Sequence, residues 1–379
     1  MYDVAVLGLG GMGSAVAATL AARNLRVLGL EQFARGHTLG SSAGRTRMIR
    51  KAYFEDPAYV PMLLRAYELW YELQRARGES LIDITGILMA GDPRSEVLRG
   101  ARETSRRHDL PFEDLDARTL RERYPEVRLR DGEIACFEPE GGLLYPEKAI
   151  AVQLAAAERN GAELRFGCTV VDWWRSNWSG PLDIRLADGI VERAERLAIC
   201  AGPWLAKLAP ELGVPLRIQR NVQLWFEPAS PRLRLGTFPA FFLDRAGQPP
   251  LYGFPDTGDG LKAAFHGVGP DTSPQSLDRQ IRPDDVLPVR EALDGFLPGA
   301  VGKFRDGKAC MYSLTPDQHF VIDLDPRDRA VAFAGGFSGH GFKFAPVVGE
   351  LVAELLYDGG TRLDTDFLKL QRFTAAASA

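Results

Sequence analysis

The sequence predicts an α/β fold with α+β elements, in which a Rossmann-like domain is interleaved with a sheet-rich second domain. Three observations lead to this prediction. A strand, a glycine-rich turn, a helix and a second strand follow one another within residues 4–30. Helices and strands alternate at both ends of the chain, whereas its middle is rich in short strands. The length of 379 residues allows two domains, or three.

The first elements in chain order form a βαβ unit. Residues 4–7 have the pattern of a buried strand, residues 14–22 are good helix formers, and residues 26–30 return as a strand. A further helix is expected from Asp56, a favourable N-cap, with Pro57 at the first helical position.

The middle of the chain is expected to alternate short strands with turns. These strands are expected near residues 81–90, 134–139, 163–174, 181–189, 196–204 and 252–255. The stretches 163–174 and 181–189 have the pattern of antiparallel partners. One helix should open at Pro146 and stop at Gly161, and a last helix should end at Gly359.

The composition is that of an ordinary globular protein, with 45% hydrophobic and 25% charged residues. A net charge of -4 gives no indication of a nucleic-acid or membrane partner. No apolar run approaches the ~18 residues of a membrane span, and the start lacks a signal-peptide pattern. The four cysteines and five histidines are dispersed. We therefore expect a cytoplasmic protein with neither a disulfide framework nor a metal site.

The glycine-rich turn has the spacing of a dinucleotide fingerprint. Gly8, Gly10 and Gly13 form GxGxxG between the first strand and the first helix, and Glu31 follows the second strand. The glycines allow a tight turn and close approach of a pyrophosphate, and the carboxylate suits a ribose diol. This pattern fits NAD and FAD alike. The apolar strand ending in AGPW, residues 201–204, is typical of FAD-dependent amine oxidoreductases and favours FAD.

Several later stretches carry a more specific resemblance. They are GSSAGRTRMIRKAY at 40–53, YGFP and LKAAFH within 252–266, CMYSLTPDQHF at 310–320 and GGFSGHGFKF at 335–344. With the fingerprint, and in this order over essentially the whole chain, they resemble the monomeric sarcosine oxidase family, which includes N-methyltryptophan and L-pipecolate oxidases. The resemblance implies a fold like that of glycine and D-amino-acid oxidases. It implies an FAD-binding domain of residues 1–85, 145–215 and 305–379, and a substrate-binding domain of residues 86–144 and 216–304.

The resemblance also implies a role for Cys310. Members of the family hold FAD covalently through a cysteine thioether to the flavin 8α-methyl group, and the matching cysteine in CMY is Cys310. A thiolate is the required nucleophile, and the basic Lys308 nearby would favour it. The alternative for any cysteine is a small buried hydrophobe, and we expect that role for Cys136, Cys168 and Cys200.

Residues for catalysis and substrate binding follow from the same matches. Lys262 is expected to activate oxygen, His266 and Tyr312 to face the substrate, and Arg47 to lie over the flavin. Arg50 and Lys343 are expected to bind the substrate carboxylate, beside the aromatic Tyr252. Without the resemblance, the arginines would be a solvated basic turn. Lys262 would then be a snorkelling lysine, with its charged end in solvent, and His266 and the tyrosines would be ordinary core residues.

The residues expected to hold FAD come from the fingerprint, the turn near 41–46, the AG turn and the two carboxyl-terminal motifs. They are Gly8, Gly10, Gly11, Met12, Gly13, Glu31, Ser41, Ser42, Arg45, Thr46, Val170, Ala201, Gly202, Trp204, Cys310, Met311, Gly336, Ser338, Gly339, His340, Gly341 and Lys343. One departure stands out: Ser42 and Ala43 replace a frequent His pair, and Arg45 replaces an acid. The Ser-Ser form is closer to pipecolate oxidases.

The resulting hypothesis is a monomeric, FAD-dependent oxidase of small secondary amino acids. Sarcosine is the first choice, with dioxygen as acceptor and glycine, formaldehyde and hydrogen peroxide as products. L-pipecolate or another N-methyl amino acid is the alternative within the family. More distant alternatives are an NAD-dependent dehydrogenase, a flavin dehydrogenase with a protein acceptor, and a non-catalytic nucleotide-binding protein.

Overall fold

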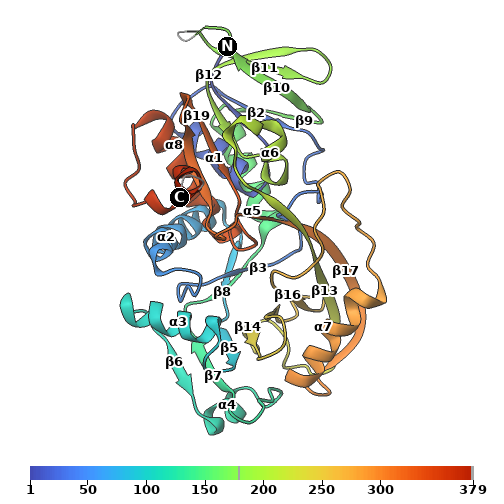
Figure 1. Cartoon of the computed structure of the whole chain (residues 1–379). Coiled ribbons are helices and arrows are strands. Elements are labelled where there is room, and N and C mark those ends of the chain that lie inside the picture. The colour runs from blue at the N-terminus through green and yellow to red at the C-terminus, as the bar shows by residue number, and fades with distance from the viewer. Residues whose placement is uncertain (178–179, 377–379) are drawn as a thin grey trace.

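The structure, a computed structural model, describes residues 1–177 and 180–376. Figure 1 shows an α/β part that holds both chain ends and a second, sheet-rich part below it. The helices are α1 (Gly11–Ala22), α2 (Val60–Arg77), α3 (Glu96–Arg107), α4 (Ala117–Arg123), α5 (Pro146–Arg159), α6 (Leu205–Leu208), α7 (Pro283–Phe296), α8 (Ala345–Tyr357) and α9 (Gln371–Ala376). Among these, none is both long enough and apolar enough to cross a membrane.

The first sheet is built on five parallel strands in the order β9-β2-β1-β12-β19. β18 extends it antiparallel to β19, and the first half of β12 pairs with β11, which pairs with β10. The bounds are β1 (Tyr2–Leu7), β2 (Val27–Glu31), β9 (Glu163–Phe166), β10 (Val170–Arg175), β11 (Leu182–Leu186), β12 (Val191–Ile199), β18 (Val321–Asp325) and β19 (Asp328–Gly335). The predicted βαβ unit is β1-α1-β2.

One sequence expectation about this sheet is wrong in part. The stretch 163–174 is two strands, because Gly167 turns the chain with φ +73°. Only β10 pairs antiparallel with β11, whereas β9 lies parallel to β2 at the sheet edge. The alternation of apolar residues predicts that a stretch forms a strand but does not predict which strand it pairs with. Here the first half of the stretch pairs with β2 and the second half pairs with β11.

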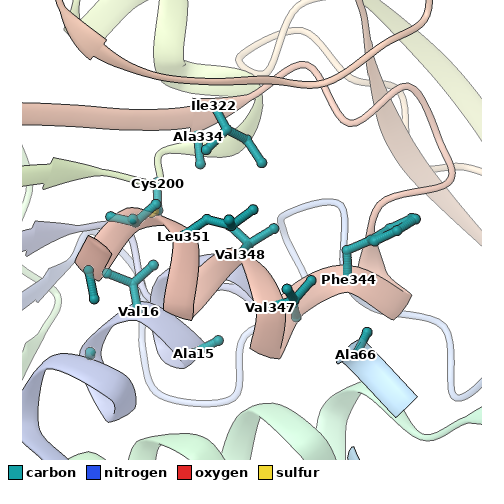
Figure 2. Close-up of a cluster of buried hydrophobic side chains, with 14 of the residues drawn as sticks. Ala15, Val16, Ala66, Cys200, Ile322, Ala334, Phe344, Val347, Val348 and Leu351 are labelled. Atoms are coloured by element: carbon teal, nitrogen blue, oxygen red, sulfur yellow. The ribbon is translucent and has the colours of Figure 1, made fainter. Parts of the chain in front are cut away.

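Helices α1, α5 and α8 cover one face of the first sheet, and α2 packs against α8. Figure 2 shows part of this contact, where Val16 of α1 and Leu351 of α8 lie below Ala334 of β19. Gly349 lets α8 approach α1, since a Cβ there would lie 2.9 Å from the carbonyl oxygen of Ala15. Leu351 is fully buried, so its truncation to Ala should cost about 2–5 kcal/mol of stability. The opposite face is covered by β10, β11 and α6.

The helix predicted from Asp56 begins as expected. The Asp56 carboxylate accepts the backbone N–H of Ala58 at 2.7 Å. Its first turn is a 3₁₀-helix (η1, Pro57–Tyr59), and α2 continues from Val60. This segment matters for the site because it follows the chain stretch that contains Arg50.

The second sheet has the order β17-β13-β16-β15-β14-β5-β7-β6. Its bounds are β5 (Ile87–Gly91), β6 (Glu113–Leu115), β7 (Ile134–Glu138), β13 (Arg217–Pro228), β14 (Ala240–Asp244), β15 (Leu251–Phe254), β16 (Leu261–Phe265) and β17 (Val301–Leu314). Helix α7 packs on one face of this sheet, and α3 on part of the other. A small third sheet of β3 (Arg47–Ile49), β8 (Gly142–Leu144) and β4 (Ile82–Ile84) completes the strands. β17 runs through residue 305, where one domain boundary is predicted, and the division into domains stays a prediction.

Candidate active site

A cavity of about 390 Å³ runs from the β1–α1 turn to one face of the second sheet. Most of the residues predicted for the site line it. These are Gly8, Gly10, Gly11, Met12, Glu31, Ser41, Ser42, Arg47, Arg50, Val170, Ala201, Gly202, Trp204, Tyr252, His266, Met311, Tyr312, Gly336, Ser338, Gly339, His340, Gly341 and Lys343. The remaining predicted residues do not line it: Gly13, Arg45, Thr46, Lys262 and Cys310.

The glycine turn is shaped for close approach of a ligand. Gly8 has φ +87°, and a Cβ at Gly13 would lie 1.7 Å from the Gly8 carbonyl oxygen, so neither position has room for a side chain. At Gly10 the nearest obstacle to a Cβ is the Ser42 hydroxyl, 3.9 Å away, so the backbone faces open space. The turn leads directly into the amino terminus of α1, where N–H groups and the helix dipole favour phosphate.

Glu31 ends β2 as a buried carboxylate. It accepts backbone N–H groups from Leu9 at 2.8 Å and Phe33 at 3.1 Å. Burial opposes ionisation, but His37 and these backbone donors outweigh it and lower the pKa of Glu31. The residue is therefore an anionic acceptor at the point where a ribose diol would lie.

Two buried hydroxyls support a polar ligand in this cavity. The side-chain oxygens of Ser41 and Ser313 have no hydrogen-bond partner within the described ranges 1–177 and 180–376, and both residues line the cavity. Leaving a buried polar group unpaired costs free energy, so such groups usually have a partner. A ligand with many acceptors, such as the FAD predicted from the sequence, would satisfy them. The residues present thus fit this cofactor.

Strand register places Lys262 and Tyr312 on one face of the second sheet together with Cys310, whereas Arg47 lies in β3 of the third sheet. Asn221 of β13 lies opposite Cys310 of β17, and Trp225 lies opposite Lys262 of β16. Because side chains alternate along a strand, Cys310 and Tyr312 share this face. The Tyr312 hydroxyl lies 3.5 Å from His266 Nδ1. Burial lowers the pKa of His266 to about 4, so the imidazole is neutral near pH 7.

Lys262 is buried beside the turn that precedes β3. Its ammonium donates to the carbonyl oxygens of Gly44 at 2.7 Å and Thr46 at 2.8 Å. Its third N–H has no acceptor among the residues that the structure describes. Burial, with the charge of Arg47, lowers the pKa of Lys262 well below its ordinary value.

Two cations and one carboxylate meet at the other end of the cavity. Arg50 donates to both oxygens of Glu55, at 2.5 and 2.6 Å. Burial opposes ionisation, but Arg50 and Lys343 help to lower the pKa of Glu55 to about 2. Burial and the charge of Arg50 lower the pKa of Lys343 to about 7. The cavity therefore presents more positive than negative charge here, which suits a small carboxylate.

His340 holds the backbone near Lys343. Its Nε2 lies 3.1 Å from the Gln318 carbonyl oxygen and must donate to it, so Nδ1 accepts from the Tyr53 hydroxyl. Burial lowers the pKa of His340 to about 3, in agreement with this neutral form. The Lys343 ammonium donates to the His340 carbonyl oxygen at 2.5 Å. His340 thus fixes the segment that aims Lys343 into the cavity.

The two arginines of the 45–47 turn point in different directions. Arg47 lines the cavity and donates to the carbonyl oxygens of Ser41 and Ala43. Arg45 points away from it, pairing with Asp306 at 2.5 Å and lying over the Trp225 ring at 4.4 Å. The expected contact of the Arg45 side chain with the cofactor stays a prediction, and the geometry favours a role in joining the turn to the second sheet.

The sequence interpretation missed three polar residues of the site. Glu55 pairs with Arg50, and Glu147 accepts the backbone N–H groups of Gly44 at 2.7 Å and Arg45 at 3.0 Å. Gln223 donates to Cys310 Sγ at 3.2 Å. Only Gln223 carried a signal, because Gln219, Asn221 and Gln223 recur every second residue and so place three amides on one face of β13. For metals, no group of three or more suitable side chains occurs in the described part of the chain.

Comparison with known proteins agrees with this geometry. The family described as FAD dependent oxidoreductase matches residues 3–355. The monomeric sarcosine oxidase of Streptomyces avermitilis is 41% identical over 99% of this chain and 98% of its own. The N-methyl-L-tryptophan oxidase of Yersinia pestis is 34% identical over 98% of this chain and 99% of its own.

A solved structure supports the same fold. NikD, an unusual amino acid oxidase essential for nikkomycin biosynthesis, has a TM-score of 0.86, at 23% identity over 97% of each chain. The fold class and the family resemblance predicted from the sequence motifs are confirmed. The chain belongs to the FAD dependent oxidoreductase family and, within it, to the group of the monomeric sarcosine oxidases and N-methyl-L-tryptophan oxidases.

Proposed function

We propose that this protein oxidises small secondary amino acids with FAD and dioxygen, and that sarcosine is its preferred substrate. L-pipecolate and larger N-methyl amino acids are the alternatives within the family. The observation that carries the proposal is the pair of buried cations, Arg50 and Lys343, in the same cavity as the dinucleotide turn. The names of the relatives support the substrate class. Family membership favours FAD over the NAD-dependent alternative.

The chain's own groups have distinct tasks in this proposal. Bound FAD would supply the oxidising chemistry, taking a hydride equivalent from the substrate C–H bond and passing two electrons to dioxygen. Arg50 and Lys343 would hold the substrate carboxylate through charge-assisted hydrogen bonds. Neutral His266 leaves the amine side of the cavity without an added cation, which suits a neutral amine.

Tyr252 and Tyr312 line the cavity together with His266. Burial raises the pKa of Tyr252 to about 12 and that of Tyr312 well above its ordinary value, so both remain phenols. Cys310 would carry the flavin as a thioether, as the CMY match implies. We also expect the chain to act as a monomer in the cytoplasm.

The test is an anaerobic screen with the purified holoprotein. Sarcosine, N-methyl-L-tryptophan, L-pipecolate, L-proline and glycine are added separately, and loss of the flavin's visible absorption is followed in time. We expect fastest bleaching with sarcosine and, on admitting air, return of the absorption with formation of hydrogen peroxide. No bleaching with any secondary amine would reject the proposed activity, and fastest bleaching with L-pipecolate would select the alternative substrate.

A further inference from the structure

Gln223 is a buried amide at the centre of the second sheet. It lies in β13, between β17 with Cys310 and β16 with Lys262, and is only 1% exposed. The register pairs Asn221 with Cys310 and Gln223 with Lys308, so Gln223 and Cys310 are diagonal neighbours on one face.

The hydrogen bonds of this amide fix its orientation. The nitrogen donates to Cys310 Sγ at 3.2 Å and to the Ala43 carbonyl oxygen at 3.3 Å. The oxygen accepts from the Arg47 guanidinium at 3.2 Å. Turning the amide over would place its oxygen against a carbonyl oxygen and its N–H groups against a cation, so only one orientation satisfies every group.

The neighbouring turn is built to admit this amide. Gly44 has φ +130°, and a Cβ there would lie 2.0 Å from the Gln223 side-chain oxygen. Two features thus converge on the same contact, a glycine in a conformation that other residues rarely adopt and a polar side chain in a buried strand. An apolar side chain of similar size would occupy the strand without the cost of burying an amide, so the fold alone does not require Gln223.

We propose that Gln223 is a positioning residue for attachment of the flavin to Cys310, an inference that rests on the covalent attachment proposed above. A donor aimed at the sulfur stabilises the negative charge of the attacking thiolate and holds it in one place. The same amide holds Arg47, which lines the cavity. One side chain therefore aligns the nucleophile and a cation at the cofactor.

Forming the thioether is a two-electron oxidation, and dioxygen is the oxidant that accepts the electrons. One C–H bond of the flavin 8-methyl group and the S–H bond of Cys310 are replaced by a C–S bond. The two electrons and two protons released are taken up by dioxygen, which becomes hydrogen peroxide, as in the proposed amine oxidation. The protein supplies the thiolate and its orientation.

The test measures attachment itself. The full chain, expressed under riboflavin limitation, is mixed with saturating FAD in air, and the gain of one FAD in intact mass is followed. In Gln223→Leu and Gln223→Glu we expect the first-order rate of attachment to fall about tenfold or more. Gln223→Glu keeps the shape and an acceptor for Arg47 but loses the donor to sulfur and to the Ala43 carbonyl oxygen. The matched control is Asn221→Leu, which removes the adjacent buried amide that donates to Gln219.

The outcomes separate this role from the attachment on which it rests. A wild-type protein without covalent FAD would reject both. Covalent wild-type protein with an unchanged rate in Gln223→Glu would reject only the role of Gln223. An equal loss in Asn221→Leu, or weaker noncovalent FAD binding with an unchanged rate at saturation, would show a general effect on packing and overturn the inference.

Discussion

The guanidinium of Arg50 donates to both carboxylate oxygens of Glu55, at 2.5 and 2.6 Å, inside the cavity that we assign to the substrate. Both side chains are largely withdrawn from solvent, with 4% and 14% exposure. An internal carboxylate therefore already binds the cation that is proposed to recognise the substrate carboxylate. The two anions must share or compete for Arg50.

Glu55→Gln should strengthen binding of a carboxylate inhibitor. The substitution removes a buried anion whose pKa is about 2, so its charge is present at every working pH. We expect up to about tenfold tighter binding of methoxyacetate, an isostere of sarcosine without the amine, in a titration followed by flavin absorption. Glu68→Gln, at an exposed pair with Arg65, is the control. Weaker binding in Glu55→Gln would mean that Glu55 instead holds Arg50 in its binding geometry.

Truncating either cation should weaken the same inhibitor. Each of Arg50→Ala and Lys343→Met removes a charge-assisted hydrogen bond of about 1.5–3 kcal/mol, which is roughly ten- to hundredfold in affinity. Lys51→Ala is a matched control from the same segment, because its ammonium pairs with Glu140 at 2.8 Å instead of lining the cavity. Unchanged affinity in both cavity variants would reject the assignment of the carboxylate site.

The nucleotide end of the site was predictable because its signal is local. The turn, α1, β2 and Glu31 lie within one stretch of 31 residues, and the glycine spacing follows from steric limits inside that stretch. The sheet face was partly predictable too, since period two places Cys310 with Tyr312. The same period also predicts that Lys262 and His266, four residues apart, share a face, although β16 itself ends at Phe265.

The contacts between distant segments were not predictable. Gln223 and Cys310 are 87 residues apart, and their contact depends on the register of β13 with β17. The pairing of Lys262 with the carbonyl oxygens of Gly44 and Thr46 joins residues more than 200 positions apart. Local patterns give the face on which a side chain lies, whereas its partner depends on how separate segments dock.

Carboxylate binding should depend on pH through Lys343. Burial brings the pKa of this lysine down to about 7, so in the free site its ammonium is charged below pH 7 and neutral above it. Affinity for methoxyacetate should therefore be constant below pH 7 and fall above it, by at most about tenfold per pH unit. His266 and His340, with pKa values of about 4 and 3, do not titrate in this range. Lys343→Met should remove the dependence, and a persisting slope would assign it to another group.

The flavin should remain on the chain after denaturation. We expect a fluorescent band on a denaturing gel and an intact mass raised by one FAD. Cys310→Ala should abolish both signals. Cys168→Ala is a sharp control, because Cys168 lines the cavity at the Glu31 end but is not in the CMY motif. Complete release of flavin from the wild-type protein into the supernatant would contradict the covalent link.

The last prediction separates the two half-reactions and concerns Lys262. The first electron given to dioxygen creates a negative charge, which favours the ammonium form of Lys262 against the effect of burial. A buried ammonium stabilises such a charge far better than water does. Lys262→Met keeps the length and removes the charge, so reoxidation by dioxygen should slow by at least about tenfold while reduction by amine stays comparatively intact. Lys51→Met, the same change at a lysine that pairs with Glu140 and does not line the cavity, controls for a general loss of positive charge. Stopped-flow measurements of the reduction and reoxidation rates test this prediction. Slow reduction with normal reoxidation would make Lys262 a substrate residue instead. A loss of bound flavin would mean that Lys262 mainly anchors the Gly44–Thr46 turn.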